Sequence, residues 1–109
     1  MTIYSTALVA TDRPGRYGKQ LVSHLSRRTG GQWSDADGSG WIDFGSGRAE
    51  VSSTDEGLAL SIAADEPDLG RLEDVIGRHL VRFGARNELR VAWTRENGEP
   101  GTVQQNDGP

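Results

Sequence analysis

The stretch "LALSIAADEPDLGRLEDVIGRHLVRFG", residues 58–84, changes its hydrophobic period halfway along. In its first part Leu58, Leu60 and Ile62 alternate with small or polar residues, which is typical of a β-strand with one covered face. After Pro67 the apolar residues recur every three or four positions, which is typical of an amphipathic helix. The stretch therefore predicts a strand followed directly by a helix. The predicted apolar stripe of that helix is Leu69, Leu72, Val75, Ile76, His79, Leu80 and Phe83.

Upstream, the chain opens with a predicted strand at residues 3–10 and continues into a first helix. Asp12 is the predicted N-cap of that helix, Pro14 fits its first turn, and Gly30 ends it. One face of the helix is kept together by the spacing of Tyr17, Leu21, His24, Leu25 and Arg28.

Short alternating runs separated by turn residues fill the middle of the chain. They predict strands at residues 31–35, 40–44, 48–53 and 58–64, and "ELRVAWT" predicts a closing strand after the second helix. The predicted order is β-α-β-β-β-β-α-β. This order is typical of an α+β fold, and we expect a two-layer sandwich of an antiparallel sheet with two helices on one face.

The length of 109 residues predicts one domain, which we place at residues 1–95. The remaining segment, "ENGEPGTVQQNDGP", has no apolar period and is rich in Gly, Pro, Asn and Gln. We expect residues 96–109 to form a disordered tail, because they cannot bury enough apolar surface to offset the entropy of ordering.

Composition excludes several classes of function. The net charge of −4 argues against nucleic-acid binding, and the absence of cysteine excludes disulfides and thiolate chemistry. We find neither a signal peptide nor a membrane span, so we expect a cytoplasmic protein with no membrane partner.

The start of the first helix is unusually basic. Arg13, Arg16 and Lys19 lie within its first two turns, where the helix dipole and free N–H groups already favour negative charge. Such an arrangement predicts a site for a small anionic ligand. The alternative is a solvated face that makes ion pairs with acidic residues elsewhere.

The chain has two histidines, and each precedes a leucine on the apolar side of a predicted helix. Since both helices are expected on one sheet face, His24 and His79 should lie close together. No carboxylate or thiolate shares either helical face, so we expect no metal and no cofactor. The pair can be structural, can contact a ligand, or can carry a proton, because imidazole titrates near neutral pH.

Glu73 and Asp74 are adjacent on the second helix and point about 100° apart, so they do not form a facing pair of catalytic carboxylates. We interpret both as structural, with either one able to pair with Arg78 on the surface.

Two segments, "RYGKQLVSHL" (residues 16–25) and "RLEDVIGRHLVRFGARNELRVAWT" (residues 71–94), carry a resemblance to a known family. They resemble the small bacterial domain of unknown function 2218, from which this chain departs at Gly18 and at Gly84–Ala85. The resemblance implies a link to iron uptake, because relatives occur beside or fused to siderophore-interacting flavoproteins. It implies no reaction.

We therefore expect an accessory or binding domain rather than an enzyme. The first hypothesis is a domain that binds a small anionic ligand, linked to iron or siderophore metabolism, with Arg13, Arg16, Lys19, His24 and His79 as ligand-binding residues. The second is a protein-interaction domain, either a homodimer or a partner of a siderophore-interacting flavoprotein. The third is an enzyme in which a helix histidine carries a proton.

Overall fold

The structure is a computed structural model that describes residues 2–83 and 89–105. The predicted helix end at Gly84 and residues 106–109 of the predicted tail lie outside this part of the chain. In chain order the elements are β1 (Thr2–Val9), α1 (Pro14–Thr29), β2 (Gly31–Ser34), β3 (Ser39–Asp43), β4 (Gly47–Thr54), β5 (Gly57–Asp65), α2 (Glu66–Phe83), β6 (Arg90–Arg95) and β7 (Pro100–Gln105).

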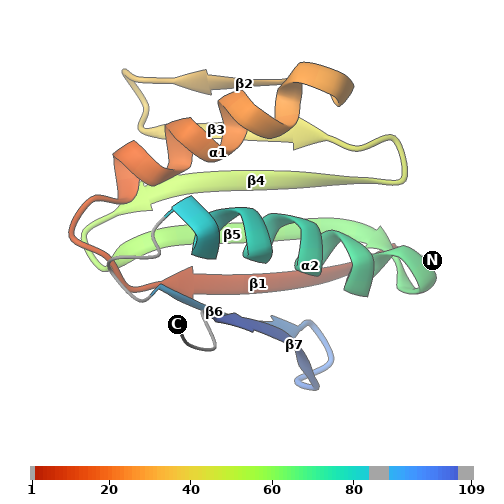
Figure 1. The fold of residues 1–109 in the computed structure, drawn as a ribbon. Helices are drawn as coiled ribbons and strands as arrows, with labels where there is room; N and C mark the ends of the chain where they lie inside the picture. Colours follow the sequence, from red (N-terminus) through yellow and green to blue (C-terminus); the bar gives the residue numbers. More distant parts are fainter. Residues whose placement is uncertain (1, 84–88, 106–109) are drawn as a thin grey trace.

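The strands form one antiparallel sheet in the order β2-β3-β4-β5-β1-β6-β7 (Figure 1). β1 lies inside the sheet, because it pairs with β5 along its whole length and with β6 on its other side. The predicted α+β class and the order of the first eight elements are confirmed. Neither helix, among the residues described, is long and apolar enough to cross a membrane.

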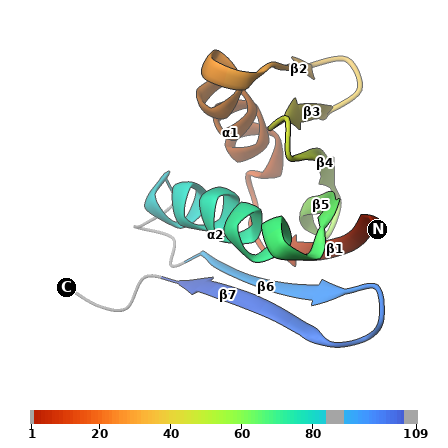
Figure 2. The ribbon, with the colours of Figure 1, turned by 90° about the vertical axis from the view of Figure 1, so that its right-hand side faces the viewer.

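Both helices cover the same face of the sheet, each over a different part of it (Figure 2). α1 packs mainly on β2, β3 and β4, whereas α2 packs mainly on β5, β7, β1 and β6. The core lies between the two layers, where the alternation of β5 meets the apolar stripe of each helix. Its largest fully buried apolar side chains are Trp93, Leu21, Ile42, Leu58, Ile62, Leu69, Leu72, Ile76 and Leu80.

The start of α1 differs from the prediction. Asp12 is not the N-cap, because Arg13 occupies that position and its side chain makes no capping hydrogen bond. The backbone N–H of Arg13 instead donates to the hydroxyl of Thr11 at 3.1 Å. Gly30 ends the helix as predicted, with a positive φ of 130° and its N–H donating to the carbonyl of Ser26.

Gly18 has a packing role that the sequence did not suggest. A Cβ at this position would lie 2.8 Å from the Trp33 ring and 3.0 Å from Leu58. Glycine therefore lets the indole of β2 pack directly against α1.

The largest difference lies at the C-terminal end, where strand β7 occupies part of the predicted disordered tail. β7 pairs with β6, with Arg90 opposite Gln105 and Ala92 opposite Val103. Only Gln104 of this strand is buried. The strand therefore carries no apolar alternation, and its order depends on backbone pairing and polar contacts.

None of the described helices and strands covers the sheet face opposite the helices (Figure 2). It carries the three exposed large apolar side chains in the described part of the chain, namely Tyr4, Leu8 and Val103, which are 51%, 50% and 48% exposed. Side chains alternate between the two faces along a strand, so Tyr4, Thr6 and Leu8 of β1 share one face. Thr6 lies opposite Thr94 on β6, and Ala92, which shares a face with Thr94, lies opposite Val103 on β7.

Candidate functional site

A seam between α1 and α2 follows from the dimensions of the two layers. A sheet of seven strands at about 4.8 Å spacing spans roughly 29 Å, whereas two helices about 10 Å across cover roughly 20 Å. The two helices therefore cannot cover the whole width of the sheet face, and a seam between them is expected.

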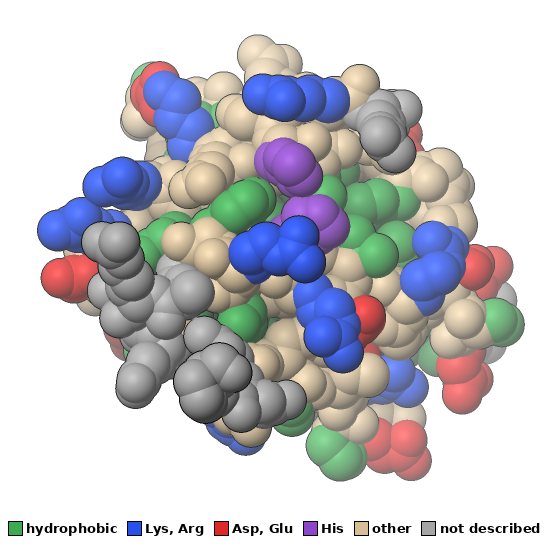
Figure 3. All heavy atoms as spheres, viewed as in Figure 1, with side chains coloured by type: hydrophobic (Ala, Val, Ile, Leu, Met, Phe, Trp, Pro, Cys, Tyr) green, Lys and Arg blue, Asp and Glu red, His purple; other side chains and the backbone are tan. Residues whose placement is uncertain are grey.

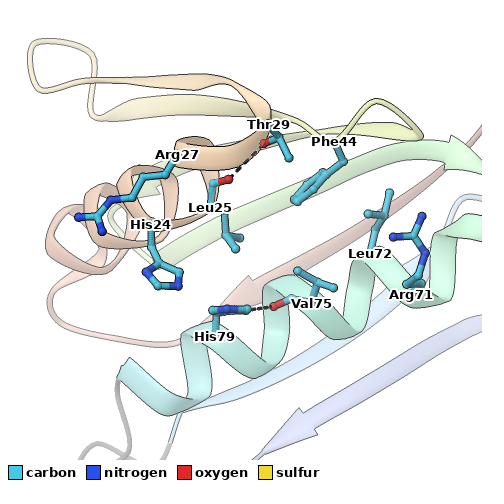
Figure 4. Close-up of a pocket in the computed structure, with 9 residues that line it drawn as sticks. All are labelled: His24, Leu25, Arg27, Thr29, Phe44, Arg71, Leu72, Val75 and His79. Carbon is cyan, nitrogen blue, oxygen red and sulfur yellow. Dashed lines mark hydrogen bonds between the residues drawn. The ribbon is translucent and has the colours of Figure 1, made fainter.

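This seam contains a groove of about 640 Å³, which is within the size range of small-molecule sites. Figure 4 shows its lining side chains, which come from α1, α2 and the connection between β3 and β4. They are His24, Leu25, Arg27, Thr29, Phe44, Arg71, Leu72, Val75 and His79. In the space-filling view the two histidines lie side by side at the centre of this face, next to apolar side chains that reach the surface (Figure 3).

His79 is held in one orientation by the backbone of its own helix. Its Nδ1 lies 2.6 Å from the carbonyl oxygen of Val75, one turn earlier. A carbonyl oxygen can only accept a hydrogen bond, so Nδ1 carries a proton and donates it. The remaining nitrogen, Nε2, is thus the one left for a ligand, as an acceptor when the ring is neutral and as a donor when it is charged.

His24 completes an aromatic cluster with His79 and Phe83. The two imidazole centroids are 5.1 Å apart with a 45° tilt, which confirms the expectation that the histidines lie close together. Phe83 packs edge-on to His24 at 5.6 Å and lies 6.3 Å from His79. His79 is half-buried, whereas His24 is exposed at the rim and does not lie in the core as the helical pattern suggested.

The charges around the groove are positive. Arg27 and Arg71 are among its nine described lining residues, and none of the nine is acidic. Arg71 donates hydrogen bonds to the hydroxyl of Ser46 at 2.9 Å and to the carboxylate of Asp68 at 3.3 Å, which offsets part of its charge. In Figure 4 Arg71 extends from α2 beside Leu72, while the Arg27 side chain runs outward from α1.

The three basic residues at the start of α1 lie outside the groove lining. Arg13, Arg16 and Lys19 are all exposed, and Lys19 pairs with Asp35 at 3.3 Å. The structure therefore brings His24 and His79 together but does not bring these three residues to them.

No group of three or more His, Cys, Asp or Glu side chains within residues 2–83 and 89–105 is arranged to hold a metal ion. The imidazole pair by itself supplies two nitrogen ligands, fewer than the three or four protein ligands that zinc sites use.

A second polar cluster lies beneath α2, on the side of the helix away from the groove. Its centre is Glu73, which is fully buried, whereas the sequence predicted it at the surface. Of the two adjacent acidic residues, only Asp74 pairs with Arg78. The Glu73 carboxylate accepts hydrogen bonds from the Ser5 hydroxyl at 2.6 Å, the Arg95 guanidinium at 3.3 Å, and the backbone N–H and hydroxyl of Thr102, both at 3.0 Å.

The same cluster reaches the core tryptophan. Trp93 Nε1 donates to the side-chain oxygen of Gln104 at 2.7 Å, and the Gln104 amide nitrogen donates to the Thr102 hydroxyl at 2.7 Å. No buried side-chain polar atom among the described residues lacks a partner. The cluster is thus saturated by the protein itself, and we interpret it as structural.

Burial raises the pKa of Glu73, but the hydrogen bonds from Ser5, Arg95 and Thr102 outweigh that effect, so the pKa lies below the ordinary value for glutamate. The carboxylate is therefore charged at neutral pH and binds its partners in that form.

Sequence reasoning found the two histidines of the groove but missed its other lining residues. Arg71 and Phe44 are far from His24 in sequence, so no local spacing connects them. Val75 and Phe83 make the apolar stripe of the second helix wider than one sheet face can cover. This extra width was a sequence signal that the second helix has apolar contacts beyond the sheet.

Comparisons with known proteins give a family and a fold. The model of the family described as "Uncharacterized protein conserved in bacteria (DUF2218)" matches residues 6–94. The chain is also similar to the NMR structure of PA4090 from Pseudomonas aeruginosa, with a TM-score of 0.60 and 17% identity over 98% of this chain and 97% of that chain. At this identity the likeness concerns the fold alone. No curated protein matches the chain.

Proposed function

Because the chain belongs to DUF2218, a bacterial family described only as uncharacterized, we propose its function from its own geometry: it is a binding or accessory domain that holds a small anionic ligand. The observation that supports this proposal is the groove between α1 and α2. It presents two facing imidazoles and two guanidinium groups, and none of its nine described lining residues is acidic.

The basic start of α1 is the other position at which an anion can bind. Arg13 and Arg16 make no ion pair with any described residue, and the first turn of the helix contains no acidic residue. The helix start is nevertheless an open surface, whereas the groove surrounds a ligand on several sides. We therefore place the ligand in the groove.

A thermal-shift screen with paired variants tests both positions. We expect at least one anion of a series that spans phosphate, sulfate, carboxylates and anionic siderophores to raise the melting temperature of the wild type. At ten times Kd a ligand adds about 1.4 kcal/mol, which corresponds to a rise of about 5–10 °C for a domain of this size. The double variant His24→Gln with His79→Gln should lose most of that rise.

The matched control is Arg16→Ala with Lys19→Ala, which removes two cationic side chains outside the groove. We expect this variant to keep the stabilisation. Loss of stabilisation in the control alone would move the site to the start of α1. If no anion stabilises the wild type, the proposal of an anion-binding domain is wrong.

The third hypothesis, a histidine that carries a proton, uses the same groove. The orientation of His79 by the Val75 carbonyl supports it. Against it, no carboxylate among the described lining residues can orient a catalytic imidazole or share a proton with it. We therefore favour binding over catalysis.

A protein-interaction domain is the second candidate function, and the uncovered sheet face supports it. Tyr4, Leu8 and Val103 are about half exposed on that face. If this face mediates a homodimer, sedimentation equilibrium at micromolar concentration should give twice the chain mass. Tyr4→Glu with Leu8→Glu should then give the mass of a monomer with unchanged circular dichroism. A monomeric wild type over the whole concentration range would exclude the homodimer.

A further inference from the structure

The groove has two chemically different parts. Leu25, Phe44, Leu72 and Val75 form an apolar part, and the two imidazoles lie beside it (Figure 4). Leu72 is fully buried, whereas the other three side chains are only half-buried, so part of their apolar surface faces the groove. A ligand without an apolar body would leave that surface in water and would lose the gain from covering it.

The polar part is suited to one small head group. His79 offers Nε2, because its Nδ1 is already used by the Val75 carbonyl, and His24 offers a second imidazole 5.1 Å away. When His79 is protonated, each ring can donate one hydrogen bond, which gives one donor for each oxygen of a carboxylate. A phosphate dianion requires more donors than these, and phosphate loops supply them from backbone N–H groups at a helix N-terminus. Here both histidines lie in the C-terminal halves of their helices.

The two arginines of the groove, Arg27 and Arg71, do not form a site for a second anionic group. Arg71 is already hydrogen-bonded to Ser46 and Asp68. Arg27 extends away from the apolar part of the groove. One anionic group per ligand therefore fits the charges of the groove.

We propose that the groove between α1 and α2 binds an amphipathic monocarboxylate, with its apolar body along Leu25, Phe44 and Val75 and its carboxylate at His24 and His79. This inference rests on the proposed function, because it specifies which anion the same groove holds. The bound state is an imidazolium–carboxylate ion pair at His79. It forms when a carboxylate meets the protonated ring, or when a carboxylic acid transfers its proton to the free Nε2 of the neutral ring.

Isothermal titration calorimetry with four probes tests both parts of the groove. The probes are acetate, hexanoate, octanoate and methyl octanoate, the last of which keeps the apolar body but cannot ionise or donate a proton. We expect affinity to rise by up to fourfold per added methylene, the equivalent of about 0.8 kcal/mol per buried CH₂ group. Methyl octanoate should bind at least tenfold more weakly than octanoate.

Variants assign the two halves of the ligand. His24→Gln should weaken octanoate by about tenfold while leaving methyl octanoate unchanged, and His24 is exposed, so this change should not affect folding. Phe44→Ser should reduce the gain per methylene and leave acetate unchanged. Arg16→Ala with Lys19→Ala is the control that should bind every probe like the wild type.

The outcomes separate this inference from the proposed function. If acetate and inorganic phosphate bind as tightly as octanoate, and His24→Gln weakens all three, the anion site stands and the amphipathic ligand is wrong. If methyl octanoate binds as tightly as octanoate, the carboxylate contact is wrong. If octanoate perturbs the amide resonances of Tyr4, Leu8 and Val103 and not those of the groove, the site assignment is wrong. If no anion binds at all, both proposals fail.

Discussion

At the scale of single residues, Glu73 shows how far the environment decides the role of a side chain. Its neighbour Asp74 makes an exposed helical ion pair with Arg78, with both carboxylate oxygens within 2.9 Å of the Arg78 Nε. Glu73, one position earlier, is completely buried and accepts hydrogen bonds from three different strands. Since a buried charge is tolerated only when it is fully hydrogen-bonded, the two carboxylates should differ strongly in their contribution to stability.

Glu73→Gln keeps the shape of the side chain and removes its charge. At pH 7 we expect a loss of about 1–3 kcal/mol in the free energy of unfolding, because the Arg95 guanidinium and the donors of Ser5 and Thr102 then face a neutral amide. Asp74→Asn is the matched control and should change the free energy of unfolding by less than about 0.5 kcal/mol. Urea denaturation measures both, and equal losses in the two variants would contradict the structural role of Glu73.

The pH dependence of the same variant follows from the lowered pKa of Glu73. A carboxyl group whose pKa is lower in the folded than in the unfolded chain stabilises fully above its unfolded pKa, about 4.3. The stabilisation is lost as the pH falls from there through the folded pKa. The difference in unfolding free energy between wild type and Glu73→Gln should therefore be constant from pH 7 to about 5 and shrink below about 4.3. A difference that stays constant down to pH 3 would show that Glu73 does not titrate in this way.

At the scale of secondary-structure elements, the closeness of α2 to β7 depends on two glycines. A Cβ on Gly77 would overlap the side chain of Gln104, and a Cβ on Gly101 would lie 2.6 Å from Glu73 Oε2 and 2.8 Å from the Cβ of Trp93. The helix and the strand are thus held at a separation that only glycine permits at these two positions.

Two glycine-to-alanine substitutions within α2 should therefore change the free energy of unfolding in opposite directions. Gly77→Ala should lower the free energy of unfolding by about 1–3 kcal/mol, because overpacking against Gln104 exceeds the gain in helix propensity. Gly70→Ala is the control in the same helix, since its Cβ would meet nothing nearer than the Arg95 guanidinium at 3.6 Å. It should raise the free energy of unfolding by about 0.5–1 kcal/mol. Chemical denaturation decides, and a stabilising Gly77→Ala would contradict the packing of α2 on β7.

At the scale of the whole molecule, the chain contains two units with the same order of elements. β1-α1-β2-β3 and β5-α2-β6-β7 are each a strand, a helix and a hairpin. Their first strands pair antiparallel with each other, and β6 of the second unit pairs with β1 of the first. β6 of the second unit thus extends the sheet beside the first unit, whereas β4, which belongs to neither unit, joins the hairpin of the first unit to β5. His24 and His79 meet where the two helices face each other.

A chain cut after Arg95, the domain boundary that the sequence suggested, tests how much the last strand matters. It lacks β7 and with it the Thr102 donors to Glu73 and the Gln104 acceptor of Trp93. We expect this chain to lose several kcal/mol and to unfold without a cooperative transition, because the Glu73 carboxylate loses two of its donors and the buried indole N–H of Trp93 loses its acceptor. Thermal melting followed by circular dichroism measures the effect. A cooperative melt at the temperature of the full chain would restore the boundary at residue 95.

The sequence by itself determined the elements whose signals are local. Alternation at Leu58, Leu60 and Ile62 and the helical spacing after Pro67 reflect one covered face each, so the strand, the helix and the α+β class could be predicted. The proximity of His24 and His79 also followed, because two helices on one sheet face must meet along their adjoining sides.

Only the tertiary structure decided the features that depend on partners distant in sequence. β7 has no apolar alternation, so only its pairing with β6 and its polar contacts to α2 mark it as a strand. Because the sequence did not predict β7, Glu73 was expected to face solvent. In the structure β7 covers Glu73, and Thr102 of this strand donates hydrogen bonds to it. The groove likewise arises from the mismatch between the width of seven strands and two helices, a property of the assembled layers that no segment of the chain carries alone.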